Sequence, residues 1–290
     1  MSHSNTQIEP LRIHPDAYPV MRVGSESFLR GFDAMSQLGG SIVGALVFVT
    51  IWQGQVSTAG RRPMGIRQLS RKLHLPYETV RRHVRGLQMS GQCVMQDGGL
   101  VVPAAVQRSK SVMVVLRTTY LNGVRLLGDL TRIGVARFTA RARPLARSGR
   151  LTKDQVVIAA WAIEILVRGM QIALDQLGGD LIKAVVFTAI WTANVKHVTN
   201  SAPASSRTIL SDDLRRPVSI LAISRSLRMP YETVRRHAQV LLTEGTCVRV
   251  GRHGLVIPES AHRRKVSGTV VAYDLMIESL AELRRAGVAV

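Results

Sequence analysis

The octapeptide PYETVRRH stands at residues 76–83 and recurs, unchanged, at residues 230–237. Proline is well tolerated in the first turn of a helix, because the N–H that it lacks would be unpaired there. Val80, Val84 and Leu87 recur at helical spacing and form one apolar stripe. The other face then carries tyrosine, glutamate and arginine. We therefore predict two short helices, 76–90 and 230–244, each with an apolar face and an arginine-rich face.

The residues around each octapeptide are repeated as well. An apolar pattern of helical period precedes each copy, at 66–73 and 220–227. Two short apolar runs on either side of a glycine-containing turn follow each copy, which is typical of a β-hairpin. The order helix, turn, helix, hairpin is that of a winged helix-turn-helix module.

The duplication extends beyond these modules. Leu38-Gly39-Gly40 matches Leu177-Gly178-Gly179, and each precedes an apolar helical segment, at 41–53 and 180–192. The predicted fold is mainly α with small β-hairpin wings: two duplicated winged helix-turn-helix modules, each flanked by apolar helices. The expected units are a flexible N-terminal tail (1–22), a first unit (23–136), a basic linker (137–153) and a second unit (154–290).

The composition points to a polyanionic partner. The chain of 290 residues carries a formal net charge of +20, which attracts nucleic acid or an anionic membrane surface. The longest apolar segments, 42–52 and 181–191, are too short to span a bilayer, and the N-terminus lacks the pattern of a signal peptide. Because many arginines lie within predicted helices, we expect double-stranded DNA as the partner, no membrane, and a cytoplasmic, nucleoid-associated location.

Catalysis and metal binding are not expected. The sequence has no Walker loop, GxGxxG, HExxH or nucleophile elbow. Cys93 and Cys247 stand at matching positions of the two repeats, and neither belongs to a CxxC motif. We therefore expect reduced core cysteines in a cytoplasmic protein. Their spacing from His83 and His237 is not that of a zinc site. We expect structural hydrogen bonds from these histidines, no enzyme activity, no cofactor and no metal.

The Glu-Thr-Val-Arg-Arg segment resembles the recognition helix of the winged helix-turn-helix regulators related to the bacterial catabolite activator protein, which carry an Arg-Glu-Thr-Val-x-Arg pattern. The resemblance covers residues 66–103 and 220–258. It implies that the glutamate and the second arginine of each copy contact base edges. Tyr77 and Tyr231 stand where the relatives carry arginine, so one base contact is lost there, or replaced by a contact with a thymine methyl group or a phosphate.

The chemistry of the side chains leads to the same roles. Arginine pairs with guanine O6 and N7 through two hydrogen bonds, and a carboxylate accepts one from the cytosine amino group. The predicted base-contacting residues are Tyr77, Glu78, Arg82, Tyr231, Glu232 and Arg236. The predicted phosphate-binding residues are Thr79, Arg81, Arg85, Arg71, Lys72, Thr233, Arg235, Arg225, Arg252 and His253.

Other roles are open for several of these residues. Glu78 is equally explained as a first-turn acid that interacts with the helix dipole, and Arg82 as a partner in a salt bridge within its module. The basic run 137–153 is either a solvated linker or a strap that contacts phosphates. The wing with Arg252 and His253 suits DNA better than the wing with Gln96 and Asp97, which predicts two related half-sites bound with unequal strength.

The function predicted from these features is a sequence-specific transcriptional regulator that contacts two half-sites. If the apolar helices 41–53 and 180–192 pack together as an internal pseudo-dimer, the two recognition helices should lie roughly 34 Å apart, one turn of DNA. A homodimer through the same helices is the alternative arrangement. The alternative functions are an architectural nucleoid protein, a replication initiator with tandem winged helices, a protein-interaction scaffold, and a repressor with an effector pocket between the apolar helices.

Overall fold

The computed structural model describes residues 13–36, 38, 41–56, 63–139, 151–198, 207–252 and 254–290. The described chain is mainly helical and contains two small antiparallel sheets, of two and three strands. The predicted mainly α class with small β-hairpins is therefore confirmed.

One order of elements occurs twice along the chain. The first half consists of α1 (Ala17–Ser36), α2 (Ile42–Val56), α3 (Ile66–Leu73), α4 (Tyr77–Met89), β1 (Val94–Gln96), β2 (Gly99–Val101), α5 (Ala104–Gln107) and α6 (Lys110–Arg132). The second consists of α7 (Lys153–Gln176), α8 (Leu181–Val195), two 3-10 turns (Lys196–Val198 and Asp212–Leu214), β3 (Val218–Ser219), α9 (Ile220–Leu227), α10 (Tyr231–Thr243), β4 (Val248–Val250), β5 (Gly254–Val256), α11 (Glu259–Arg264) and α12 (Val266–Arg285).

The boundaries of the predicted units need one correction. Helix α1 begins at Ala17, so the last part of the expected flexible tail, residues 17–22, is helical. Its apolar side chains are the reason, because Val20 and Val23 are buried in a cluster with Leu275 and Met276 of α12. Between α6 and α7 the expected basic linker lies mostly outside the described residues.

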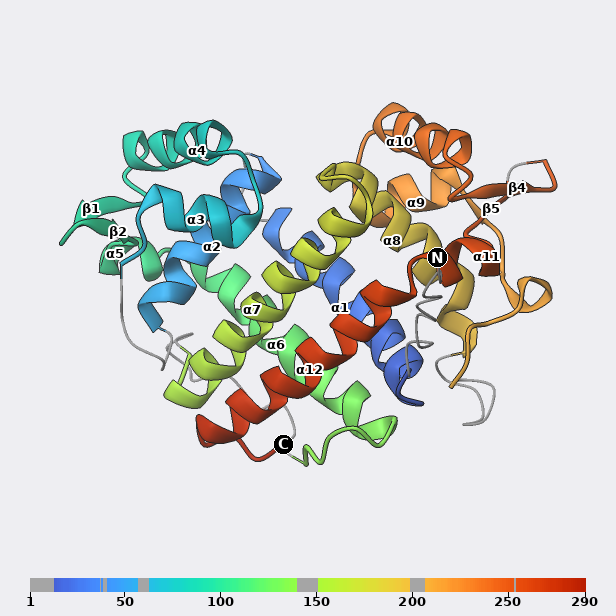
Figure 1. Cartoon of the computed structure of the whole chain (residues 1–290). Helices are drawn as coiled ribbons and strands as arrows, with labels where there is room; N and C mark the ends of the chain where they lie inside the picture. Colours follow the sequence, from blue (N-terminus) through green and yellow to red (C-terminus); the bar gives the residue numbers. More distant parts are fainter. Residues whose placement is uncertain are drawn as a thin grey trace, which may run out of the picture.

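Four long helices join the two halves (Figure 1). Helix α6 packs against α7, α7 against α12, α12 against α1, and α1 against α6. The first and last helices of each half thus contact those of the other half. At Gly123 of α6 an added Cβ would lie 2.8 Å from the Ile158 side chain of α7. Glycine at this position therefore allows the close approach of these two helices.

The apolar helices α2 and α8 are buried, as predicted. Their packing differs from the expectation that they meet each other. Helix α2 packs mainly against α4 and α7, whereas α8 packs against α10, α1 and α7. Most of their apolar surface is therefore covered within the chain, and the two halves are joined instead through α1, α6, α7 and α12.

One side-chain amide connects each hairpin to the apolar helix of its half. Asn194 at the end of α8 donates to the carbonyls of Arg216 (2.7 Å) and Leu255 (3.0 Å) and accepts from the Ile257 N–H (2.9 Å). In the first half, Gln55 of α2 accepts from the Val102 N–H (2.8 Å) and donates to the carbonyl of the same residue (3.3 Å). The sequence pattern did not reveal these two amides.

A proline packs against the first glycine of the second strand in each hairpin. An added Cβ at Gly99 would lie 2.4 Å from the Pro63 side chain, and one at Gly254 would lie 2.6 Å from Pro217. This contact gives a physical reason for the proline that stands shortly before each pair of short helices, Pro63 before α3 and Pro217 before α9.

Removing the Asn194 amide should destabilise the protein strongly. Asn194→Ala leaves buried backbone groups without partners, which costs about 1–3 kcal/mol for each unsatisfied group. We expect a loss of about 2–4 kcal/mol in the free energy of unfolding, measured by chemical denaturation. Gln55→Ala is the matched control; because Gln55 is only partly buried and contacts one residue, its loss should be clearly smaller. Equal losses would contradict this account.

Stability should also depend on pH through His262 of α11. Burial, and then the charges of Arg215, Arg22 and Arg263, lower the pKa of His262 to about 3. In the unfolded chain the pKa of histidine is about 6.5, so between these values the unfolded state binds the extra proton. The stability that the neutral, buried His262 contributes to the folded state is therefore fully present above about pH 6.5, and it is lost as the pH falls towards 3.

The test is the slope of unfolding free energy against pH between 6.5 and 4. His262→Gln removes the titrating group, and the first half carries Gln107 at the matching position. The slope of the variant should be shallower than that of the parent chain. Parallel slopes would show that other groups account for the pH dependence.

Candidate nucleic-acid interface

The turns that lead into α4 and α10 have the same geometry in both halves. Ser70 Oγ donates to the carbonyl of Leu75 at 2.7 Å, and Ser224 Oγ donates to that of Met229 at the same distance. A non-glycine residue in each turn adopts the left-handed conformation, with φ of 50° at His74 and 52° at Arg228. Both octapeptides are therefore presented by one local structure.

The predicted apolar stripes face the interior. Val80 and Val84 are fully buried in the first half, and Val234, Ala238 and Leu241 in the second. Leu87 differs from the expectation in being only partly buried. Burial of this stripe against α2 and α3, or α8 and α9, turns the opposite face of each helix outward.

The outward face carries the polar residues that the sequence predicted for DNA contacts. Tyr77 and Tyr231 are 41% and 45% exposed. Thr79 and Thr233 are partly buried. The charged residues of both helices are exposed: Glu78, Arg81, Arg82 and Arg85 on α4, and Glu232, Arg235 and Arg236 on α10. In Figure 1, α4 and α10 lie at the same end of the molecule, with the hairpins at its two sides.

An ion pair between the glutamate and the first arginine occurs on both helices. Arg81 Nε donates to Glu78 Oε2 at 2.8 Å, and Arg235 Nε donates to Glu232 Oε2 at 2.7 Å. The hydrogen bond that Arg235 donates to Glu232, and then the negative charge of Glu232, raise the pKa of Arg235. These pairs are exposed, and such pairs are weak in water, so both partners remain exchangeable.

The second arginine is different. Within the described part of the chain, neither Arg82 nor Arg236 forms an ion pair or hydrogen bond with another side chain. The expected alternative for Arg82, a salt bridge within its module, is therefore not present in this structure. Both arginine side chains are exposed to solvent.

The two histidines have the structural role that the sequence predicted. His83 Nδ1 lies 3.2 Å from Ser41 Oγ, and His237 Nδ1 donates to the carbonyl of Thr233 at 2.7 Å. His237 Nε2 also lies 3.7 Å from Asp180 Oδ2. Because Ser41 and Asp180 cap the first turns of α2 and α8, the two histidines connect α4 to α2 and α10 to α8.

The predicted phosphate-binding residues divide into two groups. Arg71, Arg85, Arg225 and Arg252 are exposed. Lys72 is instead partly buried and paired: its Nζ binds Glu164 Oε2 of α7 at 2.7 Å and Gln53 Oε1 of α2 at 3.1 Å. Lys72 therefore serves the packing of α3, and we leave it out of the proposed contacts. His253 lies outside the described residues.

The cysteines occupy core positions. Cys93 and Cys247 are buried, and burial raises the pKa of each thiol to about 11. Both are free thiols. Among the described residues no cluster of histidine, cysteine and acidic side chains has the composition of a metal site.

Helix α7 has a length and composition that would suffice to cross a membrane, which no other helix of the described part has. Half of its most apolar stretch is buried inside the protein, where α7 packs against α6, α12, α2 and α1.

Comparisons with protein-family models, curated proteins and solved structures gave no match to this chain.

Proposed function

We propose that the chain is a sequence-specific, double-stranded DNA-binding regulator of transcription without enzyme activity. In this proposal the chain contains two winged helix-turn-helix modules. The first consists of α3, α4 and the hairpin β1–β2, and the second of α9, α10 and the strands β3–β5. Helices α4 and α10 enter two successive turns of the major groove. The protein then acts at the bacterial nucleoid, in the cytoplasm.

The observation that carries the proposal is the repeated outer face of the two helices. Each presents an exposed tyrosine, a Glu–Arg ion pair and a second, uncommitted arginine at the same helical positions. Such a face has the donors and acceptors that base edges require. Two copies at one end of the molecule suit a DNA site with two related halves.

The charge distribution supports unequal contacts in the two halves. Helix α3 carries exposed Arg67 and Arg71, whereas α9 carries Leu221 and Arg225. The tip of the first wing holds Asp97 and that of the second Arg252. Since phosphate contacts position a protein on DNA without specifying sequence, the two modules would hold the backbone differently while contacting similar bases.

Binding to sheared genomic DNA, followed by sequencing of the bound fragments, tests the function directly. The proposal expects a sharp motif with two related halves about one helical turn apart. A broad preference for AT-rich DNA would indicate an architectural protein, and one strong cluster of sites a replication initiator. Absence of DNA binding at low salt would refute the proposal.

The uncommitted arginines should determine sequence preference. Arg82→Ala and Arg236→Ala should each weaken binding to the specific site by about 1–3 kcal/mol, because each removes a bidentate pair with guanine. Non-specific DNA should be affected much less. Titration of both DNA types by fluorescence anisotropy checks this.

Two neighbouring cations provide matched controls. Arg71→Ala should weaken binding to all DNA and reduce the salt dependence by about one charge. Lys72→Met should leave DNA affinity unchanged, since its ammonium pairs with Glu164, and should lower stability instead. If Arg82→Ala weakened binding to all sequences equally, Arg82 would be a phosphate contact.

A further inference from the structure

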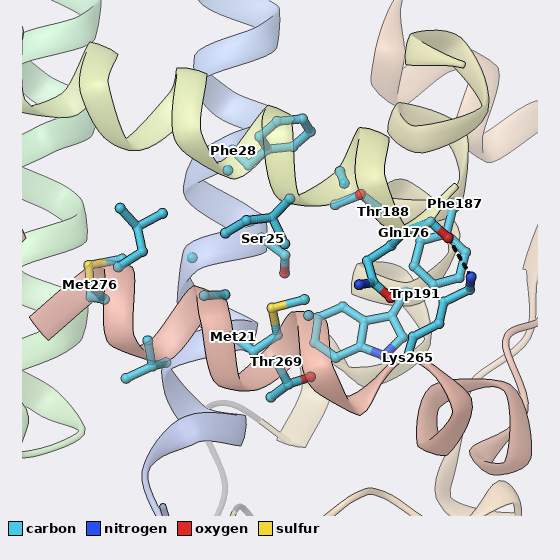
Figure 2. A pocket seen from close by; sticks show the side chains of 18 of the residues that line it. Met21, Ser25, Phe28, Gln176, Phe187, Thr188, Trp191, Lys265, Thr269 and Met276 are labelled. Carbon is cyan, nitrogen blue, oxygen red and sulfur yellow. Dashed lines mark hydrogen bonds between the residues drawn. The ribbon is translucent and has the colours of Figure 1, made fainter. Parts of the chain in front are cut away.

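A pocket opens between the two halves, away from the recognition helices. Its walls come from α1 of the first half and from α7, α8, α11 and α12 of the second. Figure 2 shows Met21, Phe28, Trp191 and Met276 among the side chains around it. The cavity itself has a volume of about 110 Å³ and is partly open to solvent.

Glycines on three helices line the pocket: Gly24 of α1, Gly169 of α7 and Gly268 of α12. An added Cβ would first meet Met276 at 3.9 Å from Gly24, and Phe28 at 3.7 Å from Gly169, so there is room for more than hydrogen at both positions. At Gly268 an added Cβ would lie 3.0 Å from the Gln176 side chain, so this glycine allows the close approach of Gln176.

Larger residues replace these glycines at the matching positions of the opposite half. When the halves are aligned on Leu38 with Leu177 and on Tyr120 with Tyr273, larger residues correspond to the three glycines: Ile163, Arg30 and Val115. Ile163 and Val115 are buried in the core. The equivalent place on the other side of the molecule, between α7, α1 and α6, therefore has larger side chains where this pocket has glycines.

A buried donor in the pocket wall has no partner. Trp191 of α8 is 3% exposed, and its Nε1 makes no hydrogen bond among the described residues. A buried N–H without a partner is costly, so it requires an explanation. By contrast, the neighbouring hydroxyls of Ser25 and Thr188 are paired with protein atoms.

The remaining polar groups favour a negative charge on the ligand. Lys265 lies at the pocket, and its Nζ donates to the carbonyl of Gln176 at 2.7 Å (Figure 2). An ammonium group has three donors, so this bond leaves capacity for an anion. The wall is otherwise lined mainly by aliphatic and aromatic side chains.

We propose that this pocket binds a small organic acid with an apolar, aromatic or branched body. The acid group accepts a hydrogen bond from Trp191 Nε1 and faces the ammonium of Lys265, while the body fills the space beside the three glycines. The ligand thereby contacts both halves of the chain at once.

The site is connected to α10 through α8. Helix α8 packs on α10, and the N-terminal end of α8 contacts α10 at two further points. Lys183 Nζ binds Oε1 of Glu244, the C-cap of α10, at 2.8 Å, and the N-cap Asp180 lies 3.7 Å from His237 in the middle of α10. A ligand wedged between α8, α1 and α12 therefore changes the position of α10 relative to α4. This regulatory step rests on the proposed DNA-binding function, and it makes the ligand an effector.

Two fluorescent probes test the site on the full-length protein. 8-Anilinonaphthalene-1-sulfonate carries an apolar body with an acid group, and N-phenyl-1-naphthylamine carries nearly the same body without it. We expect saturable binding of one equivalent of the sulfonate, and weaker binding of the neutral probe. Trp191→Phe keeps a ring but removes the N–H, and should weaken sulfonate binding about tenfold with little change for the neutral probe.

Filling the pocket is the independent variant. Gly24→Ile introduces the residue that the second half carries at the matching position, Ile163, and it should abolish binding of both probes while the melting temperature is kept or raised. A folded Gly24→Ile protein that binds the sulfonate as tightly as the parent chain would overturn the proposal. So would an equal effect of Trp191→Phe on both probes.

The regulatory step has its own readout. Saturating sulfonate probe should change the affinity for the specific DNA at least severalfold, and DNA should change the probe affinity by the same factor, because coupling is reciprocal. The Gly24→Ile protein should bind DNA without this response. Unchanged DNA affinity would overturn the regulatory step, whereas a chain that binds the probe but no DNA would overturn the proposed function alone.

Discussion

The contact of α6 with α7 at Gly123 is the constraint on which the arrangement of the molecule depends. A side chain at this position would meet Ile158 and Ala162, and the two helices would have to separate. Because α6 ends the first half and α7 begins the second, their contact fixes the halves relative to each other. Helices α1 and α12 complete this frame, and each half in turn supports its own pair of short helices and hairpin.

Local structure was predictable from the sequence, and the reason is physical. Proline at the start of α4 and α10, valine at helical spacing and glycine in the hairpin turns all act on neighbouring residues. Once the buried valines of the octapeptide were recognised from their spacing, the residues on its exposed face could be predicted as well. The same logic found the histidine contacts, because a side chain beside the apolar stripe must meet the neighbouring helix.

Long-range packing was not predictable in the same way. Apolar periodicity shows that α2 and α8 are buried but not which helices cover them, so the expected contact between the two was replaced by contacts with α1 and α7. The proline-rich beginning of the chain concealed the start of α1. Lys72 looked like a surface cation because its partner, Glu164, lies 92 residues away in sequence. The amides of Gln55 and Asn194 gave no signal, since single buried polar residues have no period.

The duplication has a consequence for how the two halves come together. In a protein built from two identical chains, the native state depends on chain concentration and both halves must carry every substitution. Here the contact between α1 and α12, and that between α6 and α7, form within one chain. Assembly of the halves is thus a unimolecular step that dilution does not reverse. Each half can also change its sequence independently of the other. The pocket lined by Gly24, Gly169 and Gly268 is an asymmetric feature of this kind, which two identical subunits could not encode.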